Sequence, residues 1–500
     1  MRMNLFAPLV GLAAVLFLSG CAKIITFPAR PSAPNGLDSG AFRAYDTNDD
    51  AVQDFFLFVD AAGRADRIGY AADKSAKPTD IIRLDDIPAG QCPHLVLILD
   101  GFGFDVVQRY YDEKNLRVFY PPSRVVAPYP TVTDPAMEDL LHGPPCRAFE
   151  AAYFSRPENL LVGGPREYLA GVNEPYNEIL DYRANTFSDA IGYIAPWDTF
   201  LSETDTCMAA FQRSAASGPR REFLAYFVSS AGVSTADGEQ GQRRCLERIE
   251  RMVLQALQTR RGRVKITLLS DHGHSYMPAS RIEFEKLLGD RGWHVGESLT
   301  GRKSVVPVSF GLVTVANFVT TNPPELAGDL IAINGVELVS YVDGDAVAVL
   351  GTLGQKAYVR CVNGAYRYSP DSGDPLKLKG VLPDFSRTYT ADDMLALTGQ
   401  HHYPIPLQRL WRAHHALVKN PPDVIASLAN DRYYGATYFD GKIKIASTHG
   451  GLNEINSTTF AMSTAGPLPP LMRSADVHTA LGKLLGRPFP QKPWPGAVTR

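Results

Sequence analysis

Four short groups of residues combine side chains that can bind a cation with a possible nucleophile: Asp100-Gly101, Tyr129–Pro135 (YPTVTDP), Asp271–His274 (DHGH) and Thr448–Gly451 (THGG). Carboxylates and imidazoles together are suitable ligands for zinc, manganese or a similar divalent ion. We therefore expect Asp100, Asp271 and His272 to bind one cation. The hydroxyl of Thr133 would be the fourth ligand, because a threonine hydroxyl is a weak nucleophile until coordination lowers its pKa.

The residues around Thr133 predict that its hydroxyl lies at the N-terminus of a helix. Pro135 suits the first position of a helix, and Asp134 or Thr133 suits the cap. The amide groups and the dipole at such an end favour a phosphate dianion. Each group alone is a weak signal, since Asp-Gly is more often a turn and a buried Asp-His-Gly can be purely structural. The order and context of the four groups together are a much more specific signal of a site.

Two of these groups follow short apolar runs that are typical of buried strands. There are three such runs, His94–Leu99, Phe223–Val228 and Val264–Leu269. Asp100 and Asp271 follow the first and the last of them, and apolar residues recur at helical spacing over Cys245–Gln258. This alternation predicts an α/β fold with a mostly parallel sheet and helices on both faces. In such sheets, polar residues just past the strand ends line the site.

A different pattern covers about residues 325–380. Valines, tyrosines and leucines alternate between pairs that are typical of hairpin turns: Asn334-Gly335, Asp343-Gly344 and Asn363-Gly364. We expect a small antiparallel β insertion here, carried by an α/β domain that spans residues 46–500. Helical patterning returns near Leu407–Lys419, and strands are expected near Ile443–Ala446 and Thr458–Met462.

The composition is that of an ordinary globular chain. Of its 500 residues, 45% are hydrophobic and 21% are charged, and the formal net charge is −3. No basic tract indicates nucleic-acid binding, so the class of partner has to be inferred from the site. The five cysteines after Cys21 lack the close spacing of a zinc knuckle, and we expect them to be structural: Cys92, Cys146, Cys207, Cys245 and Cys361.

The N-terminus is typical of an export signal. Arg2 precedes the apolar run Leu5–Leu18, which is too short to span a bilayer. The run ends in Leu-Ser-Gly-Cys, which resembles the bacterial lipoprotein box and implies a signal peptide over residues 1–20 and a lipidated Cys21. Residues 21–45 would then be the lipidated cysteine and a tether. Ala22, in place of Asp, implies an anchor in the cell envelope at the periplasmic face of the outer membrane; the alternative is an ordinary cleaved signal with a chance cysteine.

Taken together, the four groups resemble the alkaline phosphatase superfamily, most closely its nucleotide pyrophosphatase/phosphodiesterase branch. That branch has Asp-Gly after the first strand, then Pro-Thr-x-Thr, Asp-His-Gly and a late His-Gly, and the match covers roughly residues 94–465. The resemblance implies a metal-dependent phosphodiesterase or phosphatase that forms a phosphothreonine on Thr133. It also implies one complete metal position, with Asp100, Thr133, Asp271 and His272 as ligands, and it makes His449 a ligand of a second position.

The second metal position departs from the family pattern. Ser229 and Val233 stand where two-metal relatives have Asp and His, and Ala136 stands where they have an Asn that orients the phosphate. We therefore expect one zinc or manganese ion per site, with His449 binding the substrate or protonating the leaving group. Completion of a second site from elsewhere stays open, with these candidates: His274, Asp237, His401 and His402.

Hydrolysis is one of several functions that these residues allow. A single-metal phosphotransferase acting on envelope lipids or glycans would use the same first step, since only the acceptor differs. The changes at Ser229 and Val233 also suit a catalytically degenerate lipoprotein that binds or acts as a scaffold. A sulfatase fits less well, because the segment Thr133–Met137 lacks both the Cys or Ser and the Arg of the sulfatase signature.

Overall fold

The computed structural model describes residues 24–32, 42–71, 77–164, 174–184, 192, 194–216, 222–435 and 445–494. The expected signal peptide and Cys21 lie outside these residues and stay predictions. So does the first half of the expected strand at Ile443–Ala446, while the described half, Ile445 and Ala446, is not in a strand.

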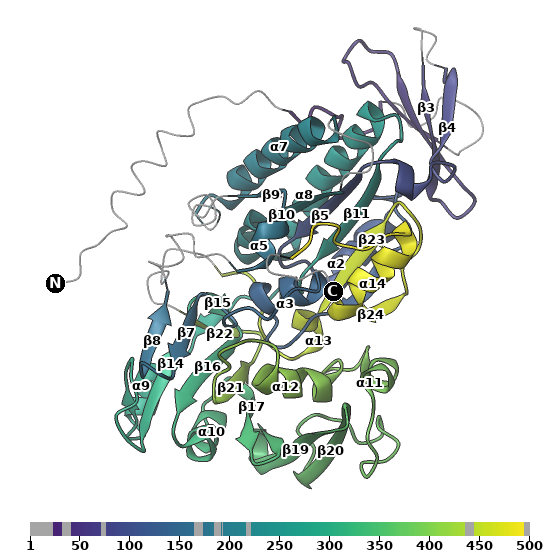
Figure 1. Cartoon of the computed structure of the whole chain (residues 1–500). Helices are drawn as coiled ribbons and strands as arrows, with labels where there is room; N and C mark the ends of the chain where they lie inside the picture. The colour runs from purple at the N-terminus through teal and green to yellow at the C-terminus, as the bar shows by residue number, and fades with distance from the viewer. Residues whose placement is uncertain are drawn as a thin grey trace, which may run out of the picture.

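A seven-stranded sheet forms the centre of the described chain (Figure 1). Its order is β24 (Leu471–Arg473), β6 (Ser123–Val126), β23 (Thr458–Ser463), β11 (Lys265–Ser270), β5 (His94–Leu99), β10 (Glu222–Phe227) and β9 (Tyr182–Arg183). Among these strands only β23 is antiparallel to its neighbours. The predicted α/β class with a mostly parallel sheet is therefore confirmed, and the apolar runs predicted as strands are β5, β10 and β11 to within one residue.

The side chains of β5 alternate between two helical layers, as the geometry of a strand requires. Leu95, Leu97 and Leu99 belong to the core under α2 (Phe104–Asp112), α7 (Pro196–Ala215) and α8 (Ser229–Thr259). Val96 and Ile98 belong to the core under α3 (Thr133–Leu140), α5 (Tyr176–Ile179) and α14 (Ser474–Leu485). Because both faces are covered, a strand with no polar side chain in its interior is stable at this position.

The second sheet is larger than the insertion expected at residues 325–380. It has eight strands, in the order β13 (His294–Val295), β14 (Ser304–Val308), β16 (Val315–Thr320), β21 (Val424–Leu428), β17 (Val336–Asp343), β18 (Ala346–Gly351), β19 (Gln355–Val362) and β20 (Ala365–Ser372). Helices α9 (Phe284–Gly289) and α10 (Pro323–Ile331) pack on one face, and α11 (Ala391–Thr398) and α12 (Pro406–His415) on the other. The strands outside residues 325–380 were not predicted, because they are short or lack turn pairs.

Two of the three predicted hairpin turns are present in the structure and one is not. Asn363 and Gly364, with φ of 53° and 79°, join β19 to β20 as the two central residues of a hairpin turn that needs positive φ at both. Gly344 lies in the loop between β17 and β18, as predicted. The prediction at Asn334-Gly335 was wrong, since this pair connects α10 to β17 rather than two strands. A glycine with positive φ serves a helix-to-strand turn equally well.

The N-terminal part of the described chain is more ordered than a tether. Strands β1 (Phe42–Tyr45), β2 (Phe55–Val59), β3 (Ala65–Tyr70) and β4 (Asp80–Arg83) form an antiparallel meander beside the end of α8 (Figure 1). The side chains of Ile25 and Phe27 are fully buried in the main core. The segment 21–45, expected as a tether, is therefore built into the fold at residues 24–27 and again at β1.

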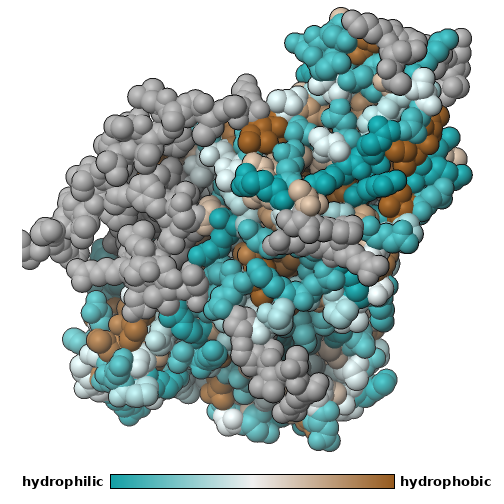
Figure 2. Space-filling view, turned by 45° about the horizontal axis from the view of Figure 1, so that its top comes forward, coloured by the Kyte–Doolittle hydropathy of each residue, from teal (hydrophilic) through white to brown (hydrophobic). Residues whose placement is uncertain are grey.

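Several short elements lie outside the two large sheets. These are the hairpin β7 (Ala152–Ser155) and β8 (Leu160–Gly163), the small sheet of β12 (Ser280–Arg281), β22 (Arg432–Gly435) and β15 (Leu312–Val313), and the one-turn helix α13 (Glu454–Ser457). The five cysteines after Cys21 are free thiols, and four of them are buried. None of the described helices has the length and apolar character needed to cross a membrane. Figure 2 shows a face on which hydrophilic residues predominate and apolar ones form small separate groups.

Candidate metal centre

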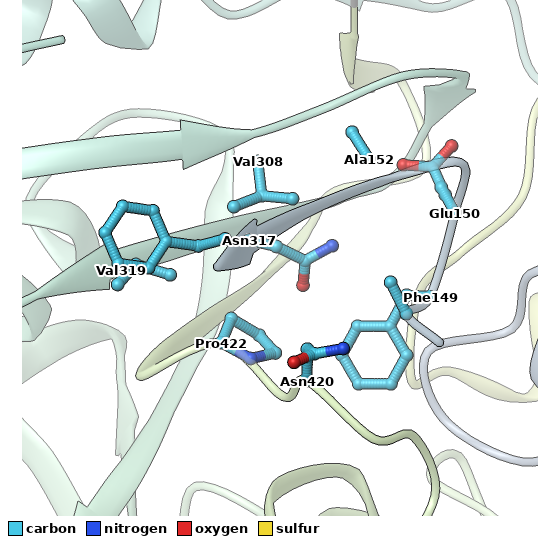
Figure 3. Close-up of a pocket in the computed structure, with 10 residues that line it drawn as sticks. Phe149, Glu150, Ala152, Val308, Asn317, Val319, Asn420 and Pro422 are labelled. Atoms are coloured by element: carbon cyan, nitrogen blue, oxygen red, sulfur yellow. The ribbon is translucent and has the colours of Figure 1, made fainter. Parts of the chain in front are cut away.

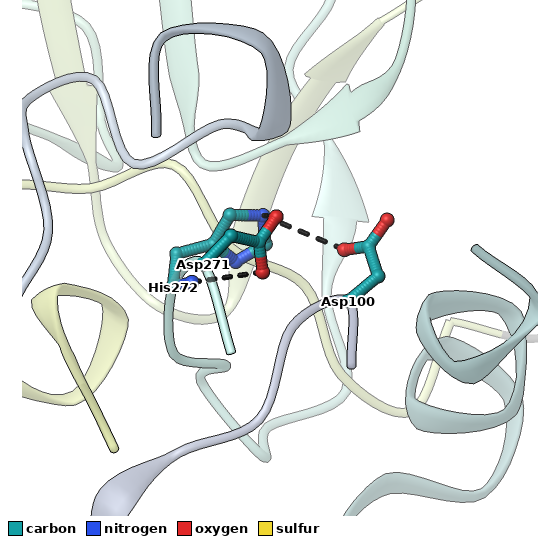
Figure 4. Close-up of side chains that lie close together, drawn as sticks. All are labelled: Asp100, Asp271 and His272. Carbon is teal, nitrogen blue, oxygen red and sulfur yellow. Dashed lines mark hydrogen bonds and ion pairs between the residues drawn. The ribbon is translucent and has the colours of Figure 1, made fainter. Parts of the chain in front are cut away.

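Asp100 and Asp271 lie together because their strands are neighbours. In the parallel pairing of β5 with β11, Leu99 is opposite Ser270, so the next residue of each strand emerges at the same edge of the sheet. Asp100, Asp271 and His272 each place one ligand atom within 4.8 Å of the others, and all three are buried (Figure 4). The structure thus brings together three of the residues predicted to bind a cation.

Each carboxylate is held through one oxygen and presents the other. Asp271 Oδ1 accepts hydrogen bonds from the backbone N–H of Gly101 (3.0 Å) and of His272 (2.9 Å). Asp100 Oδ2 accepts one from the Tyr226 hydroxyl. The remaining oxygens, Asp100 Oδ1 and Asp271 Oδ2, are buried and have no hydrogen-bond partner in the described part of the chain. They lie 3.6 and 3.5 Å from His272 Nε2.

The imidazole of His272 has the orientation of a metal ligand. Its Nδ1 lies 3.0 Å from the carbonyl oxygen of Gly273, which accepts the ring N–H and leaves the lone pair on Nε2. Thr133 Oγ1 lies 3.5 Å from the same Nε2. Two carboxylate oxygens, one imidazole nitrogen and one hydroxyl therefore converge, which fits a divalent cation such as zinc or manganese.

The electrostatics of this cluster favour a bound cation. Burial, together with the neighbouring charge of Asp271, raises the pKa of Asp100 well above its usual value. Burial also raises the pKa of Asp271 to about 6, although the N–H groups of Gly101 and His272 oppose the shift. The pKa of His272 is lowered to about 4 by burial, so its ring is neutral, the form that binds metals. A divalent ion would compensate these two buried carboxylates, which form no ion pair with a lysine or arginine among the described residues.

Glycines make two of the motifs possible. Gly101 has a φ of 72°, and a Cβ there would lie 2.7 Å from the ring of His274. A Cβ on Gly273 would lie 2.3 Å from the carbonyl oxygen of Ile455 and 2.7 Å from that of Thr458. In the Asp-Gly and Asp-His-Gly motifs, candidate metal ligands thus stand next to a glycine whose position leaves no room for a side chain.

Thr133 lies at the N-terminus of α3, as predicted, but it is the first residue of the helix rather than its cap. The N-cap is Val132, which makes no side-chain hydrogen bond, and Pro135 is the third helical residue rather than the first. Since proline has no N–H, Thr133 and Asp134 supply the amide groups at this end. Thr133 as a whole is half-buried, and its Oγ1 lies within 3.5 Å of His272 Nε2.

His449 lies beside the cluster but is not one of the three residues whose ligand atoms converge. Its ring stacks on that of His272, with 4.1 Å between centroids and 19° between planes. Its Nδ1 lies 2.9 Å from the carbonyl oxygen of Thr131, and the N–H of Gly450 donates to Thr131 Oγ1 (3.0 Å). Burial lowers the pKa of His449 to about 3. Thr131 therefore joins the loop of His449 to the segment that ends in Thr133.

Ser229 and Val233 supply no ligand in this structure. Ser229 is the first residue of α8 and donates its hydroxyl to Glu203, whereas the side chain of Val233 is fully buried in the apolar core. Ala136 is buried in the first turn of α3. None of these three residues belongs to the described group of side chains whose ligand atoms converge.

Of the residues left open for a second site, His274 alone lies beside His449. Its ring centroid is 5.1 Å from that of His449, its Nδ1 is 2.5 Å from Ser447 Oγ, and its Nε2 has no hydrogen-bond partner among the described residues. The other candidates make contacts elsewhere: Asp237 pairs with Arg244, His401 lies 3.0 Å from the carbonyl oxygen of Lys377, and His402 packs on Tyr403.

Two residues near the site were not found from the sequence. Tyr226, on the neighbouring strand β10, donates its hydroxyl to the carboxylate of Asp100. In the sequence, this position is marked only as a tyrosine within an apolar run. Arg409 is 4% exposed and donates to the carbonyl oxygens of Pro128 and Leu452, which flank the segments of Thr133 and His449. An arginine in a helix gave no sequence signal for this contact.

A pocket lies away from the cluster, between the β7–β8 hairpin and the second sheet (Figure 3). Phe149, Val308 and Pro422 line it, and the amide of Asn317 points into it. Asn317 Oδ1 is buried without a hydrogen-bond partner within the described residues. Glu150, at its rim, accepts the N–H of Gly311 (2.7 Å), and burial raises the pKa of its carboxyl to about 7. None of the five residues predicted for the site lines this pocket.

No protein-family model and no curated protein sequence matches this chain. Among solved structures, murine ectonucleotide pyrophosphatase/phosphodiesterase 5 is similar, with 12% identity and a TM-score of 0.43 over 80% of this chain and 97% of that one. Phosphonoacetate hydrolase from Sinorhizobium meliloti 1021 has 13% identity and a TM-score of 0.43, over 80% and 96% of the two chains. The human ectonucleotide pyrophosphatase/phosphodiesterase 5 has 12% identity and a TM-score of 0.42, over 81% and 96%. At such values the function of this chain has to be argued from its own residues.

Proposed function

We propose that this protein is a metal-dependent hydrolase of phosphate esters, with Thr133 as its nucleophile. One observation carries the proposal: the buried, unpartnered oxygens of Asp100 and Asp271 converge with His272 Nε2, and Thr133 Oγ1 lies 3.5 Å from that nitrogen. Zinc or manganese, one ion per site, suits this donor set. A divalent cation here supplies Lewis-acid chemistry, because it lowers the pKa of a coordinated hydroxyl and neutralises phosphoryl charge.

The reaction has two steps. Thr133 Oγ1 attacks phosphorus and loses its proton, while the bond from phosphorus to the leaving oxygen breaks and that oxygen takes up a proton. Water then attacks the phosphothreonine and gives up a proton, the bond from phosphorus to Thr133 Oγ1 breaks, that oxygen takes up a proton, and the phosphate product leaves. The N–H groups at the start of α3 stabilise the equatorial oxygens. His449, which stacks on His272 and has its Nδ1 fixed by Thr131, presents Nε2 to the bound ester.

The same first step would serve a phosphotransferase. Transfer to an envelope lipid or glycan would replace water by an acceptor hydroxyl in the second step and would leave the first step unchanged.

A degenerate scaffold is disfavoured by the cluster itself. Two adjacent buried carboxylates without a counter-charge lower stability, so a protein that only binds partners would gain from replacing them.

We further propose that the enzyme works in the bacterial cell envelope, anchored through lipid on Cys21 at the periplasmic face of the outer membrane. The support is the apolar run Leu5–Leu18 followed by Leu-Ser-Gly-Cys.

The test is hydrolysis of a chromogenic phosphodiester and a chromogenic phosphomonoester by metal-depleted protein, before and after addition of zinc or manganese. We expect turnover that depends on the metal and that falls at least about 1,000-fold in Thr133→Ala and in Asp100→Asn. The ester that is hydrolysed faster defines the substrate class. No turnover of either ester with any divalent metal, or equal rates in Thr133→Ala and wild type, would remove the hydrolase proposal.

A further inference from the structure

Residues 24–27, which begin the described chain, are fixed to the body of the protein by their backbone. The N–H groups of Ile24 and Ile25 donate to Asp205 Oδ1 of α7 at 3.1 and 2.7 Å. The N–H groups of Thr26 and Phe27 donate to Gln255 Oε1 of α8 at 2.8 and 3.1 Å. Four consecutive backbone donors are thus satisfied by two side chains.

Their carbonyl oxygens are held in the same way. Gln255 Nε2 donates to Ile24 O (2.7 Å), Arg251 Nε to Phe27 O (2.7 Å), and Arg248 Nη1 to Ile25 O (3.4 Å). Arg248 also forms an ion pair of 2.8 Å with Asp205, with both side chains mostly buried. Charge-assisted bonds of this kind are among the stronger ones.

The side chains of this segment add apolar contacts. Ile25 is 0% exposed and Phe27 is 1% exposed. The ring of Phe27 packs on Tyr45 (4.9 Å) and on Phe55 (5.7 Å, edge-on), so it also joins the N-terminal meander to the main core. Full burial of two large apolar side chains stabilises this arrangement. The segment is therefore an integral part of the fold.

Ile24 follows Cys21 after only two intervening residues. Three residue steps span at most about 10 Å, even when fully extended. We infer that lipidation of Cys21 holds the α7–α8 side of the protein against the bilayer in a preferred orientation. This inference rests on the anchor proposed above, and it names the lipid surface as the partner of that side of the molecule.

A flexible tether over residues 21–45 would behave differently. About 24 flexible residues have a root-mean-square span of roughly 25–30 Å and would let the body rotate freely above the membrane. With a short connection, α7 stays close to the headgroups. Strands β19 and β20 lie at the opposite end of the molecule from α7 (Figure 1) and remain far from them.

The surface offers two suitable positions for probes. Thr206 follows Asp205 on α7 and is exposed. Leu353, in the turn between β18 and β19, is 99% exposed. The buried native cysteines do not compete for a label, and the half-buried Cys361 is replaced by serine in every variant.

The experiment uses the full-length lipoprotein in vesicles of phosphatidylethanolamine and phosphatidylglycerol that carry an acceptor dye on a headgroup. Energy transfer is measured from a donor dye on Thr206→Cys or on Leu353→Cys. We expect efficient transfer from position 206 and weak transfer from position 353. Insertion of a Gly-Ser linker of about 20 residues between Lys23 and Ile24 should bring the two efficiencies close together, because the segment 24–27 stays in place while the connection lengthens.

Two results would overturn the inference. One is equal transfer from the two positions in the protein without the linker. The other is an intact mass that shows no acylation of Cys21, since the orientation depends on that lipid. Neither result bears on catalysis, because hydrolysis by wild type and Thr133→Ala is measured separately and does not require the membrane.

Discussion

The contact between Tyr226 and Asp100 is the residue-scale feature that most directly tests how the metal centre is held. The Tyr226 hydroxyl donates to Asp100 Oδ2 and thereby directs Oδ1 toward Asp271 and His272. Hydrogen bonds that orient a ligand typically change metal affinity by about 10–100-fold. We expect Tyr226→Phe to weaken zinc or manganese binding by about that factor, measured by competition with a chromogenic chelator.

The matched control is Tyr176→Phe. Tyr176 packs edge-on against Tyr226, with centroids 6.4 Å apart, and donates its hydroxyl to Asp134 rather than to a metal-facing residue. The Tyr176→Phe variant should leave the metal affinity nearly unchanged. Equal losses of affinity in the two variants would show that the Tyr226 hydroxyl has no specific role in holding Asp100.

At this scale, the sequence predicted the residues that follow strands and missed those that reach across from other elements. Asp100 and Asp271 could be found because a buried apolar run that stops at a carboxylate is a local pattern. Tyr226 contacts Asp100 across 126 positions of sequence. That contact follows from the pairing of β10 with β5, which no local pattern specifies.

At the scale of elements, α3 carries both Thr133 and a buried acid, Glu138. Burial, with the nearby charges of Asp134 and Glu174, raises the pKa of Glu138 to about 8, while the N–H of Tyr176 opposes the shift. The folded protein therefore keeps this proton to a higher pH than the unfolded chain does. Protonated Glu138 contributes fully to stability below the pKa of this carboxyl in the unfolded chain, about 4.5. This contribution is lost as the pH rises through about 8.

Glu138→Gln should remove this pH dependence. We expect the free energy of unfolding of the variant, relative to wild type, to rise by about 2–4 kcal/mol between pH 5 and pH 9, measured by urea unfolding at several pH values. Glu178→Gln, an exposed change on the neighbouring α5, is the control and should give parallel curves. Parallel curves for Glu138→Gln as well would contradict a raised pKa at position 138.

Helix α12 positions the nucleophile segment through Arg409. Its guanidinium donates to the carbonyl oxygens of Pro128 and Leu452 and to Ser457 Oγ (2.7 Å), and burial lowers its pKa to about 9. No carboxylate accepts from it among the hydrogen bonds of the described residues. Its role is therefore to cross-link the segments on either side of the site.

We expect Arg409→Met to lower kcat by about 10–100-fold with little change in KM, since the segments of Thr133 and His449 lose a shared donor. Arg409→Lys should restore part of kcat. The control on the same helix is Gln408→Met, which should retain wild-type rates. A loss confined to thermal stability, with kcat unchanged, would make Arg409 purely structural.

At the scale of the whole molecule, a bound cation should stabilise the fold. The cluster lies at the edge of the central sheet and takes residues that directly follow β5 and β11 and the first residue of α3, so unfolding destroys it. A ligand at about 100 times its dissociation constant adds about 3 kcal/mol to the free energy of unfolding. We expect zinc or manganese to raise Tm by about 2–4 °C and a chelator to reverse this.

Asp271→Asn is the informative variant for that measurement. It removes one of the two adjacent buried charges, so Tm without metal should rise or stay level, while the increase on adding metal should disappear. An increase of the same size in the variant would place the stabilising ion elsewhere in the protein.

The overall architecture could be predicted only in part. The central sheet followed from three apolar runs and one helical pattern, because strands buried on both faces have a distinctive composition. The N-terminal meander was missed, since its strands are short and its residues lie next to a Pro- and Gly-containing stretch that resembles a linker. The backbone N–H groups of Ile25 and Phe27 donate to side chains 180 and 228 positions away, which explains why a tether was expected there.

The central claim is that Thr133 takes up the phosphoryl group next to a bound cation. The most direct measurement is acid quenching during turnover of a phosphate ester, followed by mass spectrometry of the peptide that contains Thr133. We predict a phosphothreonine at position 133 in the metal-loaded wild type, and none in metal-depleted protein or in Thr133→Ala. Metal-dependent turnover without any phosphorylated Thr133, or at an equal rate in Thr133→Ala, would contradict the account.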